Sequence, residues 1–227
     1  MKYLLPIFLC LFTFPSFSQT QSGSFTALSW HPLSLNFNAL EVGVEKNIGN
    51  PQNSIKVYGL AYLGNTNRYE SQRNHSSDQQ DFEESYLKDR VGGWGARIEY
   101  RHYFFNRLEN ASIKPFFGLS GSYHQVQLKY ADYGWTPIEI DGVSFFNYTL
   151  NDFQEDISRT DINLSIGLRK EFIKKLVLDI YGGGVYKITD ISTTNSQSRN
   201  YNNSLLDFGY SGLGYHFGFS AGWLFTK

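Results

Sequence analysis

Residues 212–225 read GLGYHFGFSAGWLF, a stretch in which large apolar residues alternate with small or polar ones. The odd positions from Leu213 to Phe225 are apolar, whereas glycine, His216 and Ser220 fill most of the even positions. A period of two is the signature of a β-strand whose two faces meet different surroundings. The stretch therefore predicts a strand close to the end of the sequence.

The same period recurs along the rest of the chain. Residues 161–169 and 93–101 show it most clearly, and weaker extended segments fill the gaps. We expect eight strands, which cover residues 23–30, 35–45, 54–63, 93–101, 114–130, 161–169, 176–188 and 212–225. The facing of 54–63 and 114–130 stays open, as does the completeness of 23–30 as a first strand. A bulge is expected near Ala39, and a change of parity near Gln125.

Composition excludes several classes of protein. The 227 residues are 17% aromatic and 18% charged, with a formal net charge of −1. An aromatic-rich chain is not intrinsically disordered, and the absence of a basic cluster argues against nucleic acid as a partner. The longest apolar run, residues 3–17, is too short for a membrane-spanning helix.

The first residues have the pattern of an export signal. Met1 and Lys2 precede an apolar segment, and Ser16-Phe17-Ser18 offers a small-residue cleavage site. We predict a cleaved signal peptide over 1–18 and a barrel domain over 19–227. The single cysteine, Cys10, lies within the signal, so disulfides are not expected to stabilise the fold.

The predicted connections alternate in length. Residues 47–52, 105–113 and 171–174 are short, whereas 64–93, 131–158 and 189–204 are long. Short turns at one end and long loops at the other are typical of an outer-membrane barrel. The predicted fold is all-β: a closed, eight-stranded, up-and-down antiparallel transmembrane β-barrel.

Charge distribution indicates which face of the sheet is inside. One face carries ionic groups of both signs with glycine and serine, and such groups can pair inside a narrow barrel. The predicted polar network of the lumen comprises Glu41, Glu45, Lys56, Arg97, Glu99, Arg101, Asp161, Arg169, Asp179 and His216. The predicted lipid-facing residues are Ile98, Ile162, Leu164, Ile166, Leu168, Phe217, Phe219, Trp223 and Phe225.

Aromatic residues near the strand ends also favour a membrane. Tyr62, Tyr103, Phe116 and Tyr130 are among those expected in girdles at the two interfaces. A soluble, lipocalin-like periplasmic barrel that binds a ligand is the alternative. It would turn the apolar row of residues 162–168 inward.

Three segments carry a family resemblance: LEVGVEK at 40–46, RIEYRHYFF at 97–105 and KPFFGLSGSY at 114–123. They resemble the strand–turn–strand units of small outer-membrane barrels of Gram-negative bacteria, such as OmpX and the OmpA barrel. The resemblance implies location in the outer membrane, contact with its lipids and lipopolysaccharide, and a C-terminal strand that the barrel-assembly machinery recognises. It implies little chemistry. We expect a monomer with a structural or surface-interaction role.

Chemical motifs are sparse. No metal-ligand spacing or cofactor motif is present, so no catalytic residue, metal or cofactor is predicted. A lipid A-modifying enzyme remains an alternative, because such barrels can use serine with histidine. His216 and Ser220 share a face, but four residues on a strand span ~13 Å, too far for a hydrogen bond. The discriminator is whether His124 or His216 reaches a serine or threonine.

Residues 131–158 form the most distinctive predicted loop. They hold six acidic residues and no lysine or arginine, together with several aromatic residues. Three interpretations stay open: a solvated loop with or without a cation, a hairpin that extends the barrel, and a binding surface. The candidate surface comprises Trp135, Asp141, Phe145, Phe146, Asp152, Glu155 and Asp156.

Overall fold

The computed structural model describes residues 25–66, 89–104, 113–172, 175–193, 205 and 207–226. The predicted signal peptide lies outside these ranges. The elements are β1 (Phe25–Trp30), the 3-10 helix η1 (Pro32–Phe37), β2 (Ala39–Ile48), β3 (Asn50–Thr66), β4 (Asp89–Tyr103), β5 (Ile113–Ile140), β6 (Val143–Phe172), β7 (Leu176–Thr193) and β8 (Gly212–Thr226).

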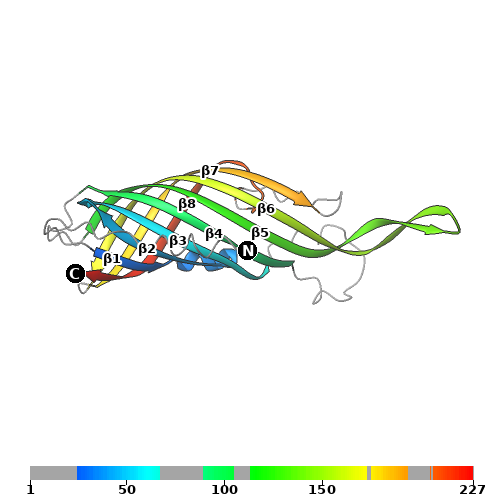
Figure 1. The fold of residues 1–227 in the computed structure, drawn as a ribbon, viewed down its shortest axis with the longest axis horizontal. Coiled ribbons are helices and arrows are strands. Elements are labelled where there is room, and N and C mark those ends of the chain that lie inside the picture. Colours follow the sequence, from blue (N-terminus) through cyan, green and yellow to red (C-terminus); the bar gives the residue numbers. More distant parts are fainter. Residues whose placement is uncertain are drawn as a thin grey trace.

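Each strand pairs antiparallel with the next, and β1 pairs with β8 to close a barrel. The closed eight-stranded antiparallel fold predicted from the sequence is therefore confirmed. We call the end where β2 meets β3, and where the C-terminus lies, the turn end (Figure 1). At the opposite end β5 and β6 extend far beyond the other strands, and we call it the ribbon end.

The alternation of the sequence sets which side chains are outside. On β6, Ile162, Leu164, Ile166 and Leu168 are 52–69% exposed on the outer surface. The polar residues between them are buried inside the barrel. This facing is opposite to that of a soluble ligand-binding barrel, which keeps its apolar row in the interior.

The two segments of undecided facing are each regular. The even positions of β3 from Ser54 to Tyr58 point inward, as does Tyr62. On β5 every even position from Lys114 to Tyr130 is buried, so the expected change of parity near Gln125 is wrong. What changes there is the chemistry of the interior, which becomes apolar beyond His124. An inward apolar residue looks the same in sequence as an outward one.

The start of the barrel also differs from expectation. Residues 25–30 form a short first strand, but Leu35 lies in η1 rather than in a strand. Pro32 begins this helix with its fixed φ, and Asn38 ends it in the left-handed conformation with φ 54°. The predicted bulge near Ala39 is wrong, because the register of β2 shifts between Asn47 and Ile48 instead.

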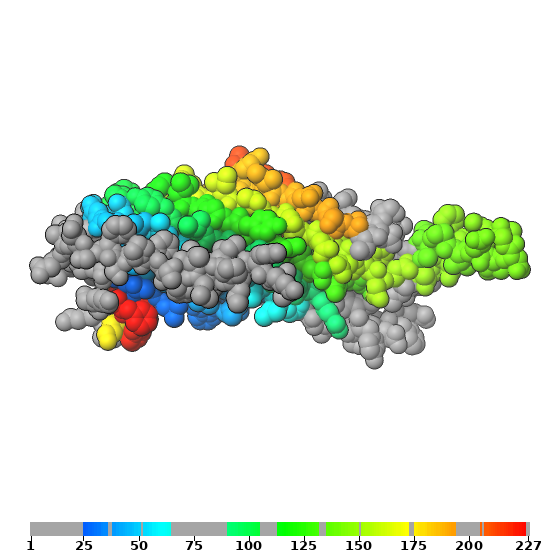
Figure 2. Space-filling view, in the orientation of Figure 1, coloured from blue at the N-terminus to red at the C-terminus, as the bar shows by residue number. Residues whose placement is uncertain are grey.

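Residues 131–158 are not a loop. They continue β5 and β6 into a hairpin whose turn, Asp141-Gly142, has φ of 52° and 80°. Positive φ at both central residues defines the type I′ turn that Asp-Gly favours. Figure 2 shows the hairpin standing clear of the barrel. The other two predicted long loops lie largely outside the described residues.

Four aromatic residues expected in interfacial girdles are inside the barrel. Tyr62, Tyr103, Phe116 and Tyr130 are at most 4% exposed. Their even or odd position on the strand, rather than their closeness to a strand end, decides their facing. Among the aromatic residues that do lie outside near strand ends are Trp94, Phe104, Tyr186, Trp223 and Phe225.

Close approach of β7 to β6 gives a first prediction. A Cβ atom added at Gly183 would lie 1.9 Å from the carbonyl oxygen of Leu164, whereas the nearest atom to a Cβ at Gly182 is 3.7 Å away. We expect Gly183→Ala to lower the free energy of unfolding by about 1–3 kcal/mol, because the strands must separate. Gly182→Ala should change it by less than about 0.5 kcal/mol. Urea unfolding in lipid vesicles measures the free energy of unfolding of both variants. Equal effects would contradict a close approach of β7 to β6 at Gly183.

Candidate functional site: the barrel interior and the ribbon

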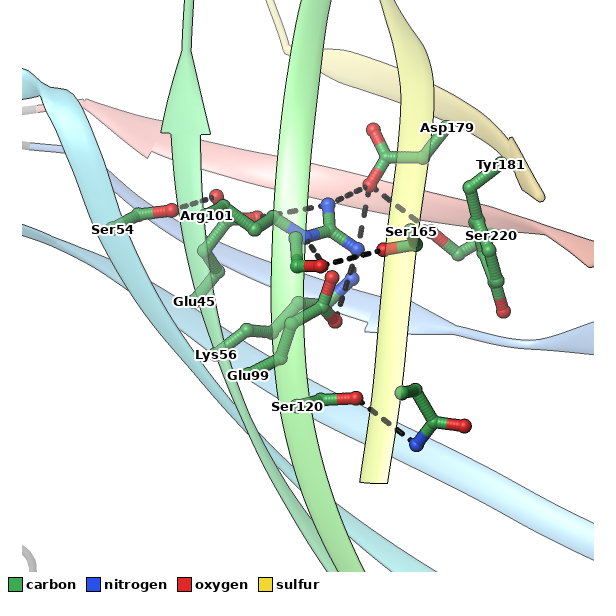
Figure 3. Close-up of polar contacts among 12 residues, drawn as sticks. Glu45, Ser54, Lys56, Glu99, Arg101, Ser120, Ser165, Asp179, Tyr181 and Ser220 are labelled. Atoms are coloured by element: carbon green, nitrogen blue, oxygen red, sulfur yellow. Dashed lines mark hydrogen bonds and ion pairs between the residues drawn. The ribbon is translucent and has the colours of Figure 1, made fainter. Parts of the chain in front are cut away.

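Two arginines organise the ionic part of the interior. Arg169 of β6 donates from Nε to Asp179 Oδ1 at 2.6 Å and from Nη2 to Glu45 Oε2 at 2.6 Å. Arg101 of β4 donates from Nη1 to Asp179 Oδ2 at 2.6 Å and from Nε to Glu99 Oε1 at 2.7 Å. In Figure 3, Arg101 and Glu99 of β4 converge with Glu45 of β2 and Asp179 of β7. The guanidinium groups thus link opposite walls of the barrel.

Further donors meet the same carboxylates. Ser54 donates to Glu45 at 2.7 Å, and Ser220 donates to Asp179 at 3.2 Å (Figure 3). Tyr103 also donates to Glu45, at 2.8 Å. Tyr58 donates to Glu99, and Lys56 Nζ lies 3.8 Å from Asp179 Oδ2.

Charge is balanced in this layer, which we call the ionic layer: Lys56, Arg101 and Arg169 face Glu45, Glu99 and Asp179. Buried charges are tolerated only when they are paired and hydrogen-bonded. The two arginines and the three carboxylates meet that condition, whereas Lys56 is paired with Asp179 at 3.8 Å but makes no hydrogen bond within the described residues.

Toward the ribbon end the interior stays polar. Arg97 forms an ion pair with Glu41. His31 Nδ1 lies 3.0 Å from the Tyr181 hydroxyl, and the His216 ring is 5.9 Å from the Tyr181 ring. His216 therefore belongs to this inner polar region.

A lipid A-modifying enzyme would need a histidine within reach of a serine or threonine, and the residue to consider is His124. Its Nε2 is 3.0 Å from Ser122 Oγ and 3.4 Å from Asp161 Oδ2, and its Nδ1 is 2.7 Å from the Tyr62 hydroxyl. A histidine does reach a serine. In a catalytic triad, however, the serine and the carboxylate occupy opposite ring nitrogens. Here both share Nε2, so the geometry is that of an internal hydrogen-bond cluster.

Apolar clusters lie beyond the polar interior. On the ribbon side, Phe208 from the β7–β8 connection packs 6.0 Å from the Tyr62 ring. It belongs to a buried cluster that also contains Ala39, Val91, Val126, Leu128, Tyr130, Phe153 and Ile157. Toward the turn end a second cluster joins Phe25, Ala27, Val177 and Leu224. We call these the outer and the inner apolar clusters.

The structure brings the predicted polar residues together inside the barrel. All ten are buried or half-buried, and each of them is on an inward position of its strand. The predicted lipid-facing residues lie on the outer surface, with Phe219 half-buried and the others exposed. Sequence reasoning missed the inward residues Tyr58, Tyr62, Tyr103, Tyr181 and His31, whereas it placed Ser220 on the face of His216. Strand parity could have found Tyr181, which shares the parity of Asp179.

The hairpin beyond the barrel, residues 131–152, is here called the ribbon. Pairing of β5 with β4 ends at Lys129, and pairing of β6 with β7 ends at Glu155. Within the described residues, the two strands of the ribbon therefore pair only with each other. A two-stranded ribbon is marginally stable in water, yet this one extends ~33 Å.

Cross-strand pairing divides the ribbon into two faces. Trp135 pairs with Tyr148, and their rings lie 5.1 Å apart. By alternation Phe146, Glu139 and Asp152 share this face, which we call the acidic aromatic face. Trp135, Phe146 and Tyr148 are 56–69% exposed. Phe145 and Ile138 lie on the opposite face.

Two members of the predicted loop surface do not belong to the exposed ribbon. Glu155 is 1% exposed and accepts a hydrogen bond from Tyr130 at 2.7 Å, inside the barrel. Asp156 accepts one from Gln127 at 2.8 Å at the barrel rim. Both lie where β6 is still part of the barrel wall. Their inclusion was wrong because the barrel continues further than the sequence indicated.

The described part of the chain contains no group of three or more histidine, cysteine or acidic side chains placed to hold a metal ion. No helix in the described ranges is long and apolar enough to cross a membrane.

Comparison with known proteins finds no matching family model and no matching curated protein. Solved structures do match. A major outer membrane protein from Thermus thermophilus is 9% identical, with a TM-score of 0.48 over 90% of this chain and 100% of that one. Neisserial surface protein A is 9% identical, with a TM-score of 0.39 over 89% and 93%. The N-terminal β-barrel domain of Pseudomonas aeruginosa OprF is 10% identical, with a TM-score of 0.37 over 90% and 100%.

The ionic layer gives a second prediction. Arg169→Met leaves Glu45 and Asp179 buried with one partner fewer, and breaking such a pair costs about 3–5 kcal/mol. Lys170→Met removes the same charge from the exposed neighbouring position and should cost less than about 1 kcal/mol. Urea unfolding in vesicles compares the two variants. Similar losses would show that the interior pairs do not stabilise the barrel.

Proposed function

We propose that this protein is an integral outer-membrane barrel that presents the ribbon at the cell surface as an interaction site. The barrel provides an apolar outer surface and a filled interior, whereas the ribbon provides the one extended structure that projects from it in the described chain. The observation that carries the proposal is the acidic aromatic face, because a contiguous patch of exposed aromatic side chains is typical of an interaction site.

The outer surface supports a location in lipid. Apolar side chains with half or more of their area exposed occur on β4, β6, β7 and β8, and examples are Ile98, Ile166, Ile180 and Phe217. Closure of the sheet pairs the backbone groups that lipid could not satisfy. Exposed apolar area of this extent is unfavourable in water. The membrane around the barrel is the outer one, since closed barrels of this kind belong to it.

The interior supports a structural rather than a transport role. Eight strands enclose a lumen that side chains fill, and here the ionic layer lies between the inner and the outer apolar clusters. An ion would have to pass the outer cluster, where Leu128 and Ile157 are each 1% exposed. The ionic layer therefore acts as a plug that ties the walls together. The same cluster separates His124 from the cell surface, which argues against an enzyme site there.

The ribbon supports a cationic partner. Glu139, Asp141 and Asp152 give it negative charge, and no lysine or arginine lies between 131 and 158. Aromatic faces attract lysine and arginine side chains through cation–π contacts. The anionic phosphates of lipopolysaccharide and a second copy of the ribbon would both be repelled. We propose that the partner is a basic polypeptide, and that the barrel itself is a monomer in contact with lipid and lipopolysaccharide.

Assembly would use the last strand. The residues Phe217, Phe219, Trp223 and Phe225 project outward from β8, and β8 forms the closing seam with β1. We propose that the assembly machinery recognises this strand. A cleaved signal peptide over residues 1–18 is part of the same proposal.

If the barrel lies in a membrane, the cost of placing an arginine on its outer surface depends on the depth of the residue in the bilayer. Leu164 lies near the middle of the barrel portion of β6, so Leu164→Arg should lower the free energy of unfolding by roughly 2–4 kcal/mol. Leu213 is 74% exposed where β8 begins at the ribbon end, and Leu213→Arg should cost roughly 0–1 kcal/mol. Unfolding in phospholipid vesicles distinguishes them. A smaller loss for Leu164→Arg than for Leu213→Arg would count against a lipid-facing belt.

The surface part of the proposal is tested with a matched pair of phenylalanines. Phe146 lies on the acidic aromatic face, and Phe145 lies on the opposite one. Fluorescently labelled octa-arginine is titrated onto the protein in uncharged phosphatidylcholine vesicles. Phe146→Ser should weaken binding roughly 2–5-fold, which corresponds to one exposed cation–π contact. Phe145→Ser should leave it unchanged.

Salt and a reversed probe complete this experiment. Binding should weaken as salt increases, since exposed charges are screened. Octa-glutamate should not bind. Equal binding of both peptides, or equal effects of the two serine variants, would refute a basic partner on this face.

A further inference from the structure

The wall of the barrel is incomplete as a sheet at one place. β1 pairs with β8 only from Phe25 opposite Thr226 to Trp30 opposite Ala221. From Gly212 to Ser220, β8 pairs with β7 on one side, and no described strand pairs with it on the other. The 3-10 helix η1 follows β1 directly and contacts both β2 and β8. We call this part of the wall, between η1 and β8, the seam.

Side chains close the seam where the backbone ladder ends. Tyr181 of β7 crosses β8 at Gly218, where an added Cβ would lie 2.5 Å from the tyrosine hydroxyl. A side chain at this position would therefore displace the tyrosine ring. The hydroxyl then meets His31 Nδ1, at the start of η1, at 3.0 Å. A single side-chain hydrogen bond thus spans the gap from β7 to the first turn.

An apolar groove lies on the outside of the seam. Its volume is about 380 Å³, which is in the range of small-molecule binding sites. Its walls are Leu33 of η1 together with Leu178, Ile180, Phe217 and Phe219, and Tyr181 and Gly218 also line it. The hydroxyl of Tyr181 is already engaged with His31. Hence every free surface in the groove is suited to hydrocarbon.

The position of the groove identifies its occupant. Ile180 and Phe217 are 59% and 71% exposed, so the groove is continuous with the apolar outer surface. Residues 217–219 lie about halfway along β8, and Phe219 pairs with Ile180. If the barrel spans a bilayer, as proposed above, this level lies among acyl chains and away from headgroups.

We propose that the seam groove is a binding site for one acyl chain of a membrane lipid. The proposal rests on the proposed membrane location. The acyl chain packs between η1 and β8. It takes the place of the β1 side chains that would cover this part of the wall if β1 continued beyond Trp30. Lipid binding thereby completes the outer surface next to the Tyr181–His31 contact.

Photolabelling tests the site. The full chain is placed in phosphatidylcholine vesicles that contain a few per cent of a phosphatidylcholine with a diazirine at the end of one acyl chain. After irradiation, mass spectrometry maps the labelled residues. We expect labelling of Leu33, Leu178 and Phe217 several-fold above that of Leu164 and Ile166, which lie at similar depth on the β6 wall.

A pair of η1 variants supplies the control. Leu33→Trp fills the groove and should reduce labelling of the seam to the level of the β6 wall. Leu35 is 52% exposed in the same helix but does not line the groove, so Leu35→Trp should leave labelling unchanged. A shift in gel mobility on boiling verifies that each variant is folded, and Leu33→Phe replaces Leu33→Trp if the latter does not fold.

The outcomes separate this proposal from the previous one. Equal labelling of the seam and the β6 wall overturns the groove site and leaves the membrane location intact, and so does unchanged labelling in Leu33→Trp. An absence of label on both walls overturns the membrane location itself.

Discussion

The interior of an eight-stranded barrel is only as wide as the side chains that fill it, and this constraint governs the whole structure. Every inward residue must pack against residues of other strands, and every inward charge must be compensated by an opposite one. Arg101 and Arg169 satisfy both conditions, because each reaches carboxylates on different strands. Their contacts fix the distance between opposite walls of the barrel. Because inward and outward residues alternate along a strand, the same contacts also determine which residues face outward.

Strand parity made much of this fold accessible from the sequence. Residues 161–169 alternate without exception, and the structure places both of their rows as the sequence indicated. Strand parity does not show which residues face inward where the interior becomes apolar. Val126 and Leu128 point inward, but nothing in their chemistry separates them from lipid-facing residues. Only the unbroken register of β5 with β6, which needs the paired strand, resolves their facing.

Local backbone chemistry explains the other differences. Pro32 and Asn38 bound a helical turn that overrides the apolar alternation of residues 35–39. Asp141-Gly142 is a hairpin signal, and it distinguishes a continued strand from a long loop. The charged interior residues were accessible from sequence because unpaired charges cannot face lipid. The tyrosines that bond to them were not, since a tyrosine suits an interface, a core and a hydrogen-bond network equally well.

The length of β5 and β6 has a mechanical consequence. Each strand runs without interruption from the ribbon tip through the barrel wall to the turn end. Tension applied at the tip along these strands is therefore distributed over the whole row of backbone hydrogen bonds that joins them to β4 and β7, which resist it together in shear. A pulling load on the ribbon is therefore carried by the barrel wall, because neither strand is interrupted between the ribbon and the wall.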